Sequence, residues 1–425
     1  KISDACHERE EIEKKLSHLK KQYQDTWDYE KIRSVVAQEI MKESIARRAE
    51  RKAERERQKQ LKSEAWNKRK AENIIFIGKG YSSLLGKKET NIQKLKENHM
   101  PIIETDKELA KFLQIEYNTL RYLVYHRDVI TFDNYYRFDI PKKSGGTRHI
   151  AAPKTQLKTA QRQILEQILQ NVEISGQAHG FIKSRSVLTS AKTHNTSPGL
   201  LINIDLENFF PTITFERVRG LYQSFGYSGY ISSLLAMVCT YCERMPLEIK
   251  GEIKYIKTSD RILPQGSPAS PMITNIICRS MDKRINGLCK KYGITYTRYA
   301  DDMSFSYTGD TSNFAIGRFL NSINTIIEAE GFHMKKEKTH ILRKNNRQYI
   351  TGIVINNEEI GVPKKWVKIL KASIYNAQKL KDSGGLVSNK TIHEISGKIA
   401  WLKSVNEKRY QKVINQGTEF LKSLT

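Results

Sequence analysis

The pattern of hydrophobic and polar positions separates a long N-terminal stretch from the rest of the chain. Residues 1–73 contain neither Gly nor Pro, which favours uninterrupted helix. One apolar stripe recurs there at three- and four-residue spacing, formed by Ile12, Leu16, Leu19, Tyr23 and Trp27. Over residues 47–70 the stripe almost disappears, and Arg, Lys and Glu alternate instead. We expect a basic helical extension: a solvated or disordered arm, or a lever that contacts RNA, DNA or a partner protein.

Beyond this stretch, helix-like and strand-like patterns alternate. A capping box at Thr105–Glu108 predicts the start of a helix. Residues 135–150 form two strand-like runs around a Ser-Gly-Gly turn, with basic residues on either side. Residues 200–205 are mostly apolar until Asp205. A buried strand that ends on a carboxylate is unusual, because an unpaired buried charge is costly. Asp205 is therefore either a metal ligand or the N-cap of a helix.

The last 70 residues have the pattern of a helical module. Pro363 stands at a predicted helix start, and a second capping box at Thr391–Glu394 predicts another. One face of the first helix is apolar, with Trp366, Leu370, Ile374 and Ala377. The other face carries Lys364, Lys368, Lys371 and Lys379. This layout favours a helix packed on protein and laid along phosphates, and the alternative is a merely solvated lysine face.

The charge composition indicates a polyanion as the partner of this chain. The chain has 425 residues, enough for roughly two to four structural units. Its 72 Lys and Arg exceed its 46 Asp and Glu, which gives a formal charge of +26. Nucleic acid is the commonest polyanion, and no apolar run approaches the ~20 residues of a membrane-spanning helix. The five cysteines form no disulfide framework, which favours a reducing cytoplasm. The isolated Cys239 and Cys242 pair favours core packing over a zinc site.

Candidate chemistry concentrates in residues 297–306, which form two alternating runs around Asp301 and Asp302. Two adjacent carboxylates at the tip of a hairpin repel each other, and a bound divalent cation relieves that repulsion. The alternative is a polar hairpin turn, because Asp is a common turn residue. Residues 263–271 hold three prolines and one glycine and predict a rigid loop that could hold a template base and a primer end.

Two further segments could contact a nucleotide. The hairpin at residues 135–150 can fold over a triphosphate, with Lys as a point charge and Arg as a planar fork. A surface hairpin that is merely basic is the alternative. Phe210 follows Asp205 by five residues, close enough to form a wall against the sugar of an incoming nucleotide.

Asp205 at a strand end, the proline-rich loop at 263–271 and Tyr299–Asp302 occur in the order of a reverse transcriptase palm. The chain resembles a reverse transcriptase from about Thr105 to its C-terminus, and it resembles the bacterial retron type most. Residues 190–194 are similar to the Asn-Ala-x-x-His of retron enzymes, with Ser190 in place of Asn. Residues 350–352 are similar to their Val-Thr-Gly, with Ile in place of Val. Residues 179–186 resemble the segment of the family that joins fingers to palm.

The resemblance implies an α+β fold: a right-hand polymerase with fingers, a ferredoxin-like palm and a helical thumb. A basic helical extension at residues 1–98 would precede fingers at 99–199, a palm with the Tyr-Ala-Asp-Asp hairpin at 200–355, and a thumb at 356–425. Asp205, Asp301 and Asp302 would be catalytic and would hold two Mg²⁺ ions, for which Mn²⁺ could substitute, ~3.5–4 Å apart.

The resemblance also implies roles for residues around the carboxylates. Lys142 and Arg148 would clamp the triphosphate, and Phe210 would exclude a 2′-hydroxyl. Gln265, with Gly266, would position template and primer. The residues expected to contact nucleic acid are Lys183, Arg185, His194, Lys364, Lys368 and Lys371.

The implied function is RNA-directed DNA synthesis in an antiphage defence system. Retron enzymes copy a structured non-coding RNA encoded beside them into branched multicopy single-stranded DNA, starting from the 2′-hydroxyl of a guanosine. The expected partners are this RNA, its DNA product, deoxynucleoside triphosphates and an effector protein, with no membrane. Two alternatives stay open: a group II intron-like or other defence-associated reverse transcriptase, and a nucleic-acid-bound scaffold that restrains a toxin effector.

Overall fold

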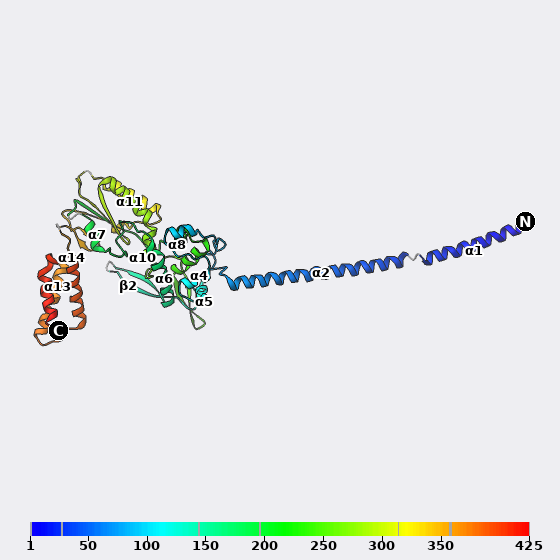
Figure 1. Ribbon diagram of the computed structural model, residues 1–425, viewed down its shortest axis with the longest axis horizontal. Coiled ribbons are helices and arrows are strands. Elements are labelled where there is room, and N and C mark those ends of the chain that lie inside the picture. The colour runs from blue at the N-terminus through cyan, green and yellow to red at the C-terminus, as the bar shows by residue number, and fades with distance from the viewer. Residues whose placement is uncertain are drawn as a thin grey trace. The chain divides into compact units, whose positions relative to one another are not determined.

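The computed structural model of the chain describes residues 2–26, 29–142, 145–194, 197–312, 314–356 and 359–424. It divides into two units, Lys1–Ile75 and Phe76–Thr425. The first unit consists of helices α1 (Ile2–Thr26) and α2 (Tyr29–Glu72), shown in blue in Figure 1. No helix in the described part of the chain is long and apolar enough to span a membrane.

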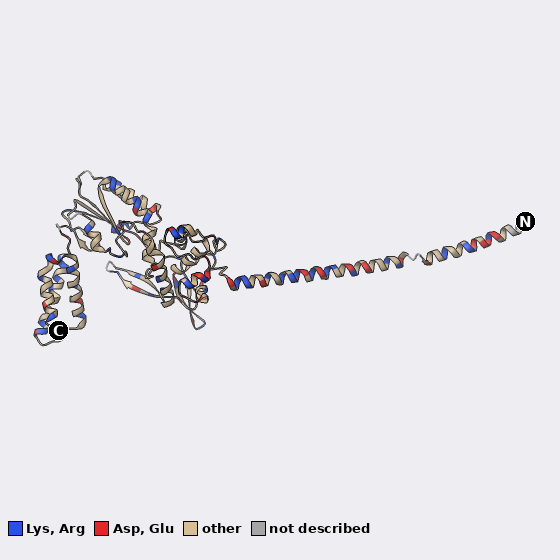
Figure 2. Ribbon diagram, in the orientation of Figure 1, with Lys and Arg blue, Asp and Glu red and all other residues tan. Residues whose placement is uncertain are grey.

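The helical prediction for the N-terminal extension is confirmed, and its apolar stripe is exposed. Ile12, Leu16, Leu19 and Tyr23 of α1 are each more than half exposed, and Trp27 lies outside the described residues. Figure 2 shows basic and acidic residues alternating along α2. Arg47 and Glu43 pair one helical turn apart at 3.3 Å, as expected of a salt-bridged helix.

The second unit begins earlier than the sequence suggests, at Phe76 rather than near residue 98. Ile77 and Leu95 are fully buried in it. Asn91 donates its backbone N–H to the carbonyl of Gly226 at 2.9 Å. Gly226 has φ +117°, and a Cβ at this position would lie 2.9 Å from the Asn91 carbonyl oxygen. Residues 76–98 therefore pack as part of the second unit and not as part of the extension.

The second unit is α+β. Its helices are α3 (Ile92–Glu97), α4 (Asp106–Phe112), α5 (Tyr117–Leu123), α6 (Thr155–Gln167), α7 (Val187–Thr193), α8 (Phe215–Phe225), α9 (Gly229–Cys239), α10 (Ser270–Ile277), α11 (Arg279–Tyr292), α12 (Ile316–Ala329), α13 (Lys364–Asp382) and α14 (Asn389–Lys422). Short 3₁₀ turns occur at η1 (Leu169–Asn171) and η2 (Lys336–Lys338). Its strands are β1 (Val129–Ile130), β2 (Tyr135–Pro141), β3 (Thr147–Pro153), β4 (Leu200–Asp205), β5 (Arg244–Ile249), β6 (Glu252–Lys257), β7 (Ile294–Tyr299), β8 (Asp302–Tyr307), β9 (His340–Arg343), β10 (Tyr349–Ile350) and β11 (Ile353–Val354).

The central sheet has four antiparallel strands in the order β7-β8-β4-β9. The β4–β8 register pairs Leu200 with Tyr307 at one end and Asp205 with Asp302 at the other. Helices α11 and α12 pack against this sheet, where Phe319 meets Phe305 with 5.5 Å between ring centroids. A β2–β3 hairpin, a β1-β6-β5 sheet and a β10–β11 hairpin complete the unit. The sheet thus brings Asp205 and Asp302, about a hundred positions apart in the chain, together at one end of its strands.

Helices α13 and α14 pack side by side, as the C-terminal pattern predicts. Leu370, Ile374 and Ala377 of α13 are buried against Ile395, Ile399 and Leu402 of α14. The capping box predicted at Thr391–Glu394 is wrong. The helix begins one turn earlier, because the Ser388 side chain caps it by accepting the backbone N–H of Thr391 at 3.3 Å. The capping box at Thr105–Glu108 is confirmed.

Candidate active site

The three acidic residues singled out from the sequence meet at one end of the central sheet. Asp301 lies in the tight turn between β7 and β8, directly before Asp302. Asp205 ends β4 opposite Asp302 in the register, and the Asp301 carbonyl accepts the N–H of Leu206 at 3.1 Å. Ala300 begins this turn at φ +57°, a left-handed conformation that a residue with a Cβ adopts only where the surroundings enforce it.

The carboxylates lie close enough to disturb one another. Burial and then the charge of Asp205 raise the pKa of Asp301. Burial, followed by the charges of Asp301 and Asp205, raises the pKa of Asp302 to about 7. The Asp302 side chain is exposed at the end of β8, so repulsion from the neighbouring carboxylates is the main physical cause of its raised pKa. Lys338 partly balances this negative charge, because its Nζ forms an ion pair with Asp205 Oδ2 at 2.5 Å.

The donor set fits a divalent cation. Carboxylate oxygens are the ligands that Mg²⁺ and Mn²⁺ prefer, and a bound cation would relieve the repulsion between carboxylates that contributes to the raised pKa of Asp301 and Asp302. Among the residues that the structure describes, no three His, Cys, Asp or Glu side chains form a closed ligand group. Asp205, Asp301 and Asp302 therefore supply suitable oxygens from positions that are neighbours in the sheet, but the three side chains are not already arranged as a complete set of metal ligands.

The mutual repulsion makes stability depend on pH. A carboxyl group whose pKa is raised in the folded state binds its proton more tightly there than in the unfolded chain. Its contribution is full below the ordinary pKa and is lost as the pH rises through about 7. With a chelator present, Asp302→Asn should therefore melt at a higher temperature than the parent protein, by a margin that grows from about pH 4 to about pH 8. Parallel melting curves would contradict the repulsion.

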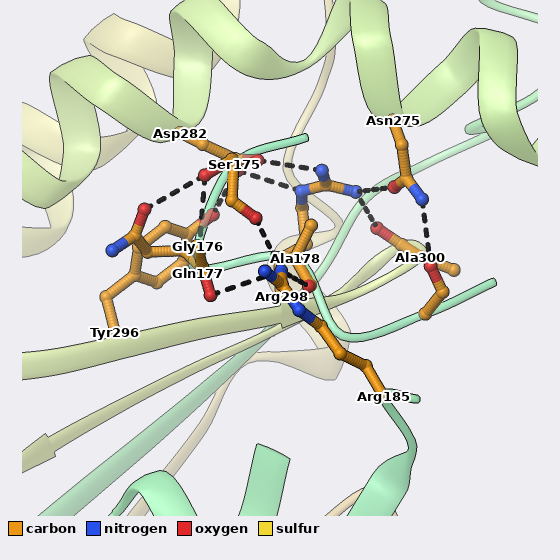
Figure 3. A network of polar contacts seen from close by, with 11 residues as sticks. Ser175, Gly176, Gln177, Ala178, Arg185, Asn275, Asp282, Tyr296, Arg298 and Ala300 are labelled. Atoms are coloured by element: carbon orange, nitrogen blue, oxygen red, sulfur yellow. Dashed lines mark hydrogen bonds and ion pairs between the residues drawn. The ribbon is translucent and has the colours of Figure 1, made fainter. Parts of the chain in front are cut away.

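A buried ion pair lies next to the turn that carries Ala300 and Asp301 (Figure 3). Arg298 of β7 and Asp282 of α11 are both fully buried, and two bonds of 2.8 Å join the guanidinium to the two carboxylate oxygens. Arg298 Nη1 also donates to Asn275 Oδ1 and to the carbonyl of Ala300, each at 3.1 Å. One guanidinium thus connects two helices to the turn that carries Asp301.

The segment before α7 docks on the same arginine. The Arg298 N–H donates to the Gln177 carbonyl at 2.7 Å, and its carbonyl accepts the His179 N–H at 2.8 Å. Arg185 Nη1 donates to the carbonyls of Ser175 at 2.7 Å and Ala178 at 2.6 Å. The half-buried Arg185 guanidinium, expected to contact nucleic acid, therefore holds its own loop in place (Figure 3).

The residues expected around the nucleotide lie on exposed hairpin positions and on a docked loop. Arg148 of β3 is exposed, and its charge lowers the pKa of Asp301, so it lies close enough to act on that carboxylate. Lys142 is exposed beyond β2, and Lys143 and Ser144 of the turn lie outside the described residues. The Gln265 carbonyl accepts the N–H of Ala151 at 2.8 Å, which fixes the proline-rich loop to β3.

Gly266 makes this close approach possible. Its φ is +125°, and a Cβ there would lie 2.9 Å from the carbonyl oxygen of Ala151. Any larger residue would therefore push the loop away from β3, which supports the prediction that this loop is rigid.

An aromatic cluster includes Tyr299, two residues before Asp301. Phe210 and Phe181 have ring centroids 6.5 Å apart, and Phe181 and Tyr299 have centroids 6.2 Å apart. Phe181 is 48% exposed and has φ +61°, so its backbone is strained while its ring faces outward. The sequence indicated Phe210 but gave no signal for Phe181, whose neighbours come from distant segments.

His194 does not lie at the surface, and its position contradicts the expected contact with nucleic acid. It is 2% exposed, and its ring nitrogens bond to Ser306 Oγ at 2.6 Å and Thr297 Oγ1 at 2.8 Å. Ser190, the departure from the retron pattern, also bonds to Thr297 Oγ1 at 2.9 Å. Burial, and after it the charge of His179, lowers the pKa of His194 to about 3, so the ring is neutral. Ser190 and His194 therefore join α7 and its C-terminal end to strands β7 and β8 of the central sheet.

The other cations expected to contact nucleic acid are exposed. They are Lys183 in the segment before α7 and Lys364, Lys368 and Lys371 on the outer face of α13. Their positions leave them available to phosphates.

Comparison with known proteins extends these observations. The family model for reverse transcriptase (RNA-dependent DNA polymerase) matches residues 140–357, which contain the three carboxylates and both predicted nucleotide-contacting hairpin residues. Retron Mx162 reverse transcriptase of Myxococcus xanthus is 32% identical over 89% of this chain and 81% of its own length. Retron Ec86 reverse transcriptase of Escherichia coli is 32% identical over 76% of this chain and 92% of its own length. Among solved structures, telomerase from Candida albicans in complex with a fragment of telomeric RNA is 12% identical, over 68% of this chain and 58% of that chain, with a TM-score of 0.40.

Proposed function

The chain belongs to the bacterial retron-type reverse transcriptases, and from this premise we propose that it copies a cognate structured RNA into branched single-stranded DNA. It is an RNA-directed DNA polymerase with an α+β, right-hand fold. The observation that carries the proposal is the meeting of Asp205, Asp301 and Asp302 at one end of the central sheet. We assign the fingers to residues 99–199, with residues 76–98 packed as part of the same unit, the palm to 200–355 and the thumb to 356–425.

The three carboxylates would hold two Mg²⁺ ions, with Mn²⁺ as a substitute. Bound there, the ions would lower the pKa of the attacking hydroxyl and neutralise charge on the leaving pyrophosphate. Arg148 and Lys142 would bind the triphosphate from the β2–β3 hairpin, and the effect of the Arg148 charge on the pKa of Asp301 supports this assignment. Gln265 would position the template–primer pair from a loop whose backbone is fixed to β3.

Phe210 would exclude ribonucleotides, and this assignment predicts a change in sugar specificity. Replacing Phe210 by Val opens the wall beside the sugar, so the variant should incorporate ribonucleotides at least about tenfold better relative to deoxynucleotides. The measurement is kcat/KM for each nucleotide on one RNA template. Phe181→Val, on the neighbouring ring, is the matched control and should change this ratio less. If the ratio stays at the parent value in Phe210→Val, Phe210 does not contact the sugar.

The proposed partners are a structured non-coding RNA, its DNA product and an effector protein in antiphage defence. The formal charge of +26 and the exposed lysines of α13 support a nucleic-acid partner. The cysteines that the structure describes are all free, which supports a reducing cytoplasm. The role of the N-terminal extension is a contact with RNA or with the effector, along α1 or α2.

The test is the nucleic acid that co-purifies with the protein. We expect one RNA species covalently joined to DNA through a 2′,5′ bond, so that a debranching enzyme changes its electrophoretic mobility. Sequencing both strands identifies the RNA and the priming guanosine. Unbranched DNA on many RNAs would instead favour a group II intron-like or other defence-associated enzyme. RNA without any DNA product would favour the scaffold that restrains a toxin.

A further inference from the structure

A second cationic cavity lies away from the catalytic strands. It encloses about 60 Å³ and is lined by α5 and the segment after it, β2, the end of α9, β5 and Arg261. None of the strands β4, β7 and β8 contributes to its wall. The charged side chains that line it, His126 aside, are Arg127, Arg137, Arg244, Arg261 and Asp133. Positive charge therefore exceeds negative charge in a space large enough for a phosphate-sized group.

Arg261 is the most buried of these cations, at 8% exposure. Its Nε donates to Thr240 Oγ1 at 3.1 Å, and its Nη2 donates to the carbonyls of Met237 and Thr240. None of these bonds uses Nη1. The described residues include no carboxylate in an ion pair with Arg261. A buried guanidinium without a counter-charge is costly, so this arrangement favours an anionic ligand.

Among the described residues of the wall, Asp133 is the one acid, and both of its oxygens already accept hydrogen bonds. One of its oxygens accepts from Arg137 Nε at 2.5 Å, and the other accepts the N–H of Tyr135 at 3.1 Å. Arg244 bonds to backbone carbonyls, among them that of Arg127 at 2.6 Å. Burial and then the charges of Arg261 and Arg244 lower the pKa of His126, which leaves that ring neutral. The cavity therefore keeps uncompensated positive charge.

Exposed aromatic rings stand at the rim, each next to a cation. The Arg127 guanidinium lies 4.4 Å from the ring centroid of Tyr125 and 5.7 Å from that of Tyr122. Lys154 Nζ lies 3.8 Å from the centroid of Phe132. The three rings are 37% to 51% exposed. Alternation of cations and open aromatic faces is the arrangement on which unpaired bases stack.

We propose that this cavity binds a phosphate of single-stranded nucleic acid, while the adjoining bases stack on Tyr122, Tyr125 and Phe132. A duplex keeps its bases stacked on each other and would leave these rings unused. Arg261 lines the cavity with an Nη1 that makes none of its hydrogen bonds to the described residues, and Arg127 supplies a cation next to the rings of Tyr122 and Tyr125. The site adds a second contact for RNA or DNA to the polymerase and does not depend on whether its product is branched.

In the test, a template–primer duplex first fills the polymerase cleft, so that a second oligonucleotide can bind only elsewhere. The full-length enzyme is loaded with an RNA template annealed to a chain-terminated DNA primer, and a fluorescent single-stranded 12-nucleotide RNA is then titrated in. The parent should bind this second oligonucleotide, and Tyr125→Ser combined with Arg127→Gln should weaken that binding about tenfold, as expected for one lost stacking contact and one lost cation. Extension of a pre-annealed primer should stay unchanged, because neither residue lies in the catalytic machinery.

A matched double variant controls for composition. Tyr292→Ser combined with Lys291→Gln changes an exposed tyrosine and an exposed lysine at the end of α11, away from this cavity and from α13, and should bind as the parent does. Absence of binding to the loaded parent, or equal losses in both double variants, overturns the proposal. Inorganic phosphate and AMP serve as competitors: displacement by AMP at concentrations similar to the oligonucleotide would overturn the assignment to a polynucleotide. Weak competition by both supports it.

Discussion

Replacing Asp301 by asparagine is expected to abolish nucleotide incorporation while leaving RNA binding largely intact. The amide removes a charged ligand from the turn between β7 and β8, where Asp205 and Asp302 are the neighbouring acids. Metal ions contribute several kcal/mol of charge stabilisation, and each 1.36 kcal/mol is tenfold in rate, so a loss of at least about a thousandfold follows. RNA contacts are expected elsewhere, at exposed cations such as Lys364 and Lys368.

Two measurements separate this result from misfolding. Primer extension gives kcat with Mg²⁺ and with Mn²⁺, and a filter-binding assay gives the affinity for the co-purified RNA. Asp382→Asn, at the exposed end of α13, makes the same chemical change away from the sheet and should leave both values unchanged. An Asp301→Asn protein that still extends a primer would show that the site is misassigned. If that variant were inactive as a polymerase but fully active in defence, the scaffold alternative would be favoured.

The three acids that meet at the end of the central sheet could be singled out from the sequence because local signals carry them. Asp301 and Asp302 are adjacent in the chain, and Asp205 ends an apolar run that reads as a strand. Their convergence depends on the β4–β8 register, which pairs Asp205 with Asp302 across about a hundred residues. No local pattern contains that register, so the order of motifs in a known family supplied it. The helical faces of α13 and α14 were likewise visible, because burial follows the helical period.

Other features depend on tertiary packing and were missed or misread. His194 was expected to contact nucleic acid because of the family resemblance, yet its ring is buried and bonds to the hydroxyls of Thr297 and Ser306 on two strands of the sheet. Arg185 was expected to bind nucleic acid, yet carbonyls of its own loop use its guanidinium. The start of the second unit was placed too late, because the contact between Asn91 and Gly226 joins segments far apart in the chain. In each case the partner, not the residue itself, decides the role.

The pair Arg298 and Asp282 is the largest feature that the sequence did not reveal, and its disruption should affect both stability and rate. Asp282→Asn leaves a buried guanidinium without its counter-charge and should lower the free energy of unfolding by about 3–5 kcal/mol. The Arg298 contact with the Ala300 carbonyl also orients the turn that carries Asp301. A misplacement of about 1 Å there can cost about a hundredfold in rate. Chemical denaturation and primer extension measure the two effects separately.

A second variant distinguishes positioning from mere stability. Arg298→Met, Asp282→Leu and Tyr296→Phe together replace the ion pair and the hydroxyl that donates to Asp282 at 2.9 Å by apolar groups of similar size. Such replacements of a buried ion pair are often neutral or stabilising, so this triple variant should recover most of the lost stability. It cannot recover the donor to the Ala300 carbonyl, so kcat should stay roughly a hundredfold low while KM for the nucleotide changes little. Recovery of kcat together with stability would show that Arg298 supports the fold and has no part in placing Asp301.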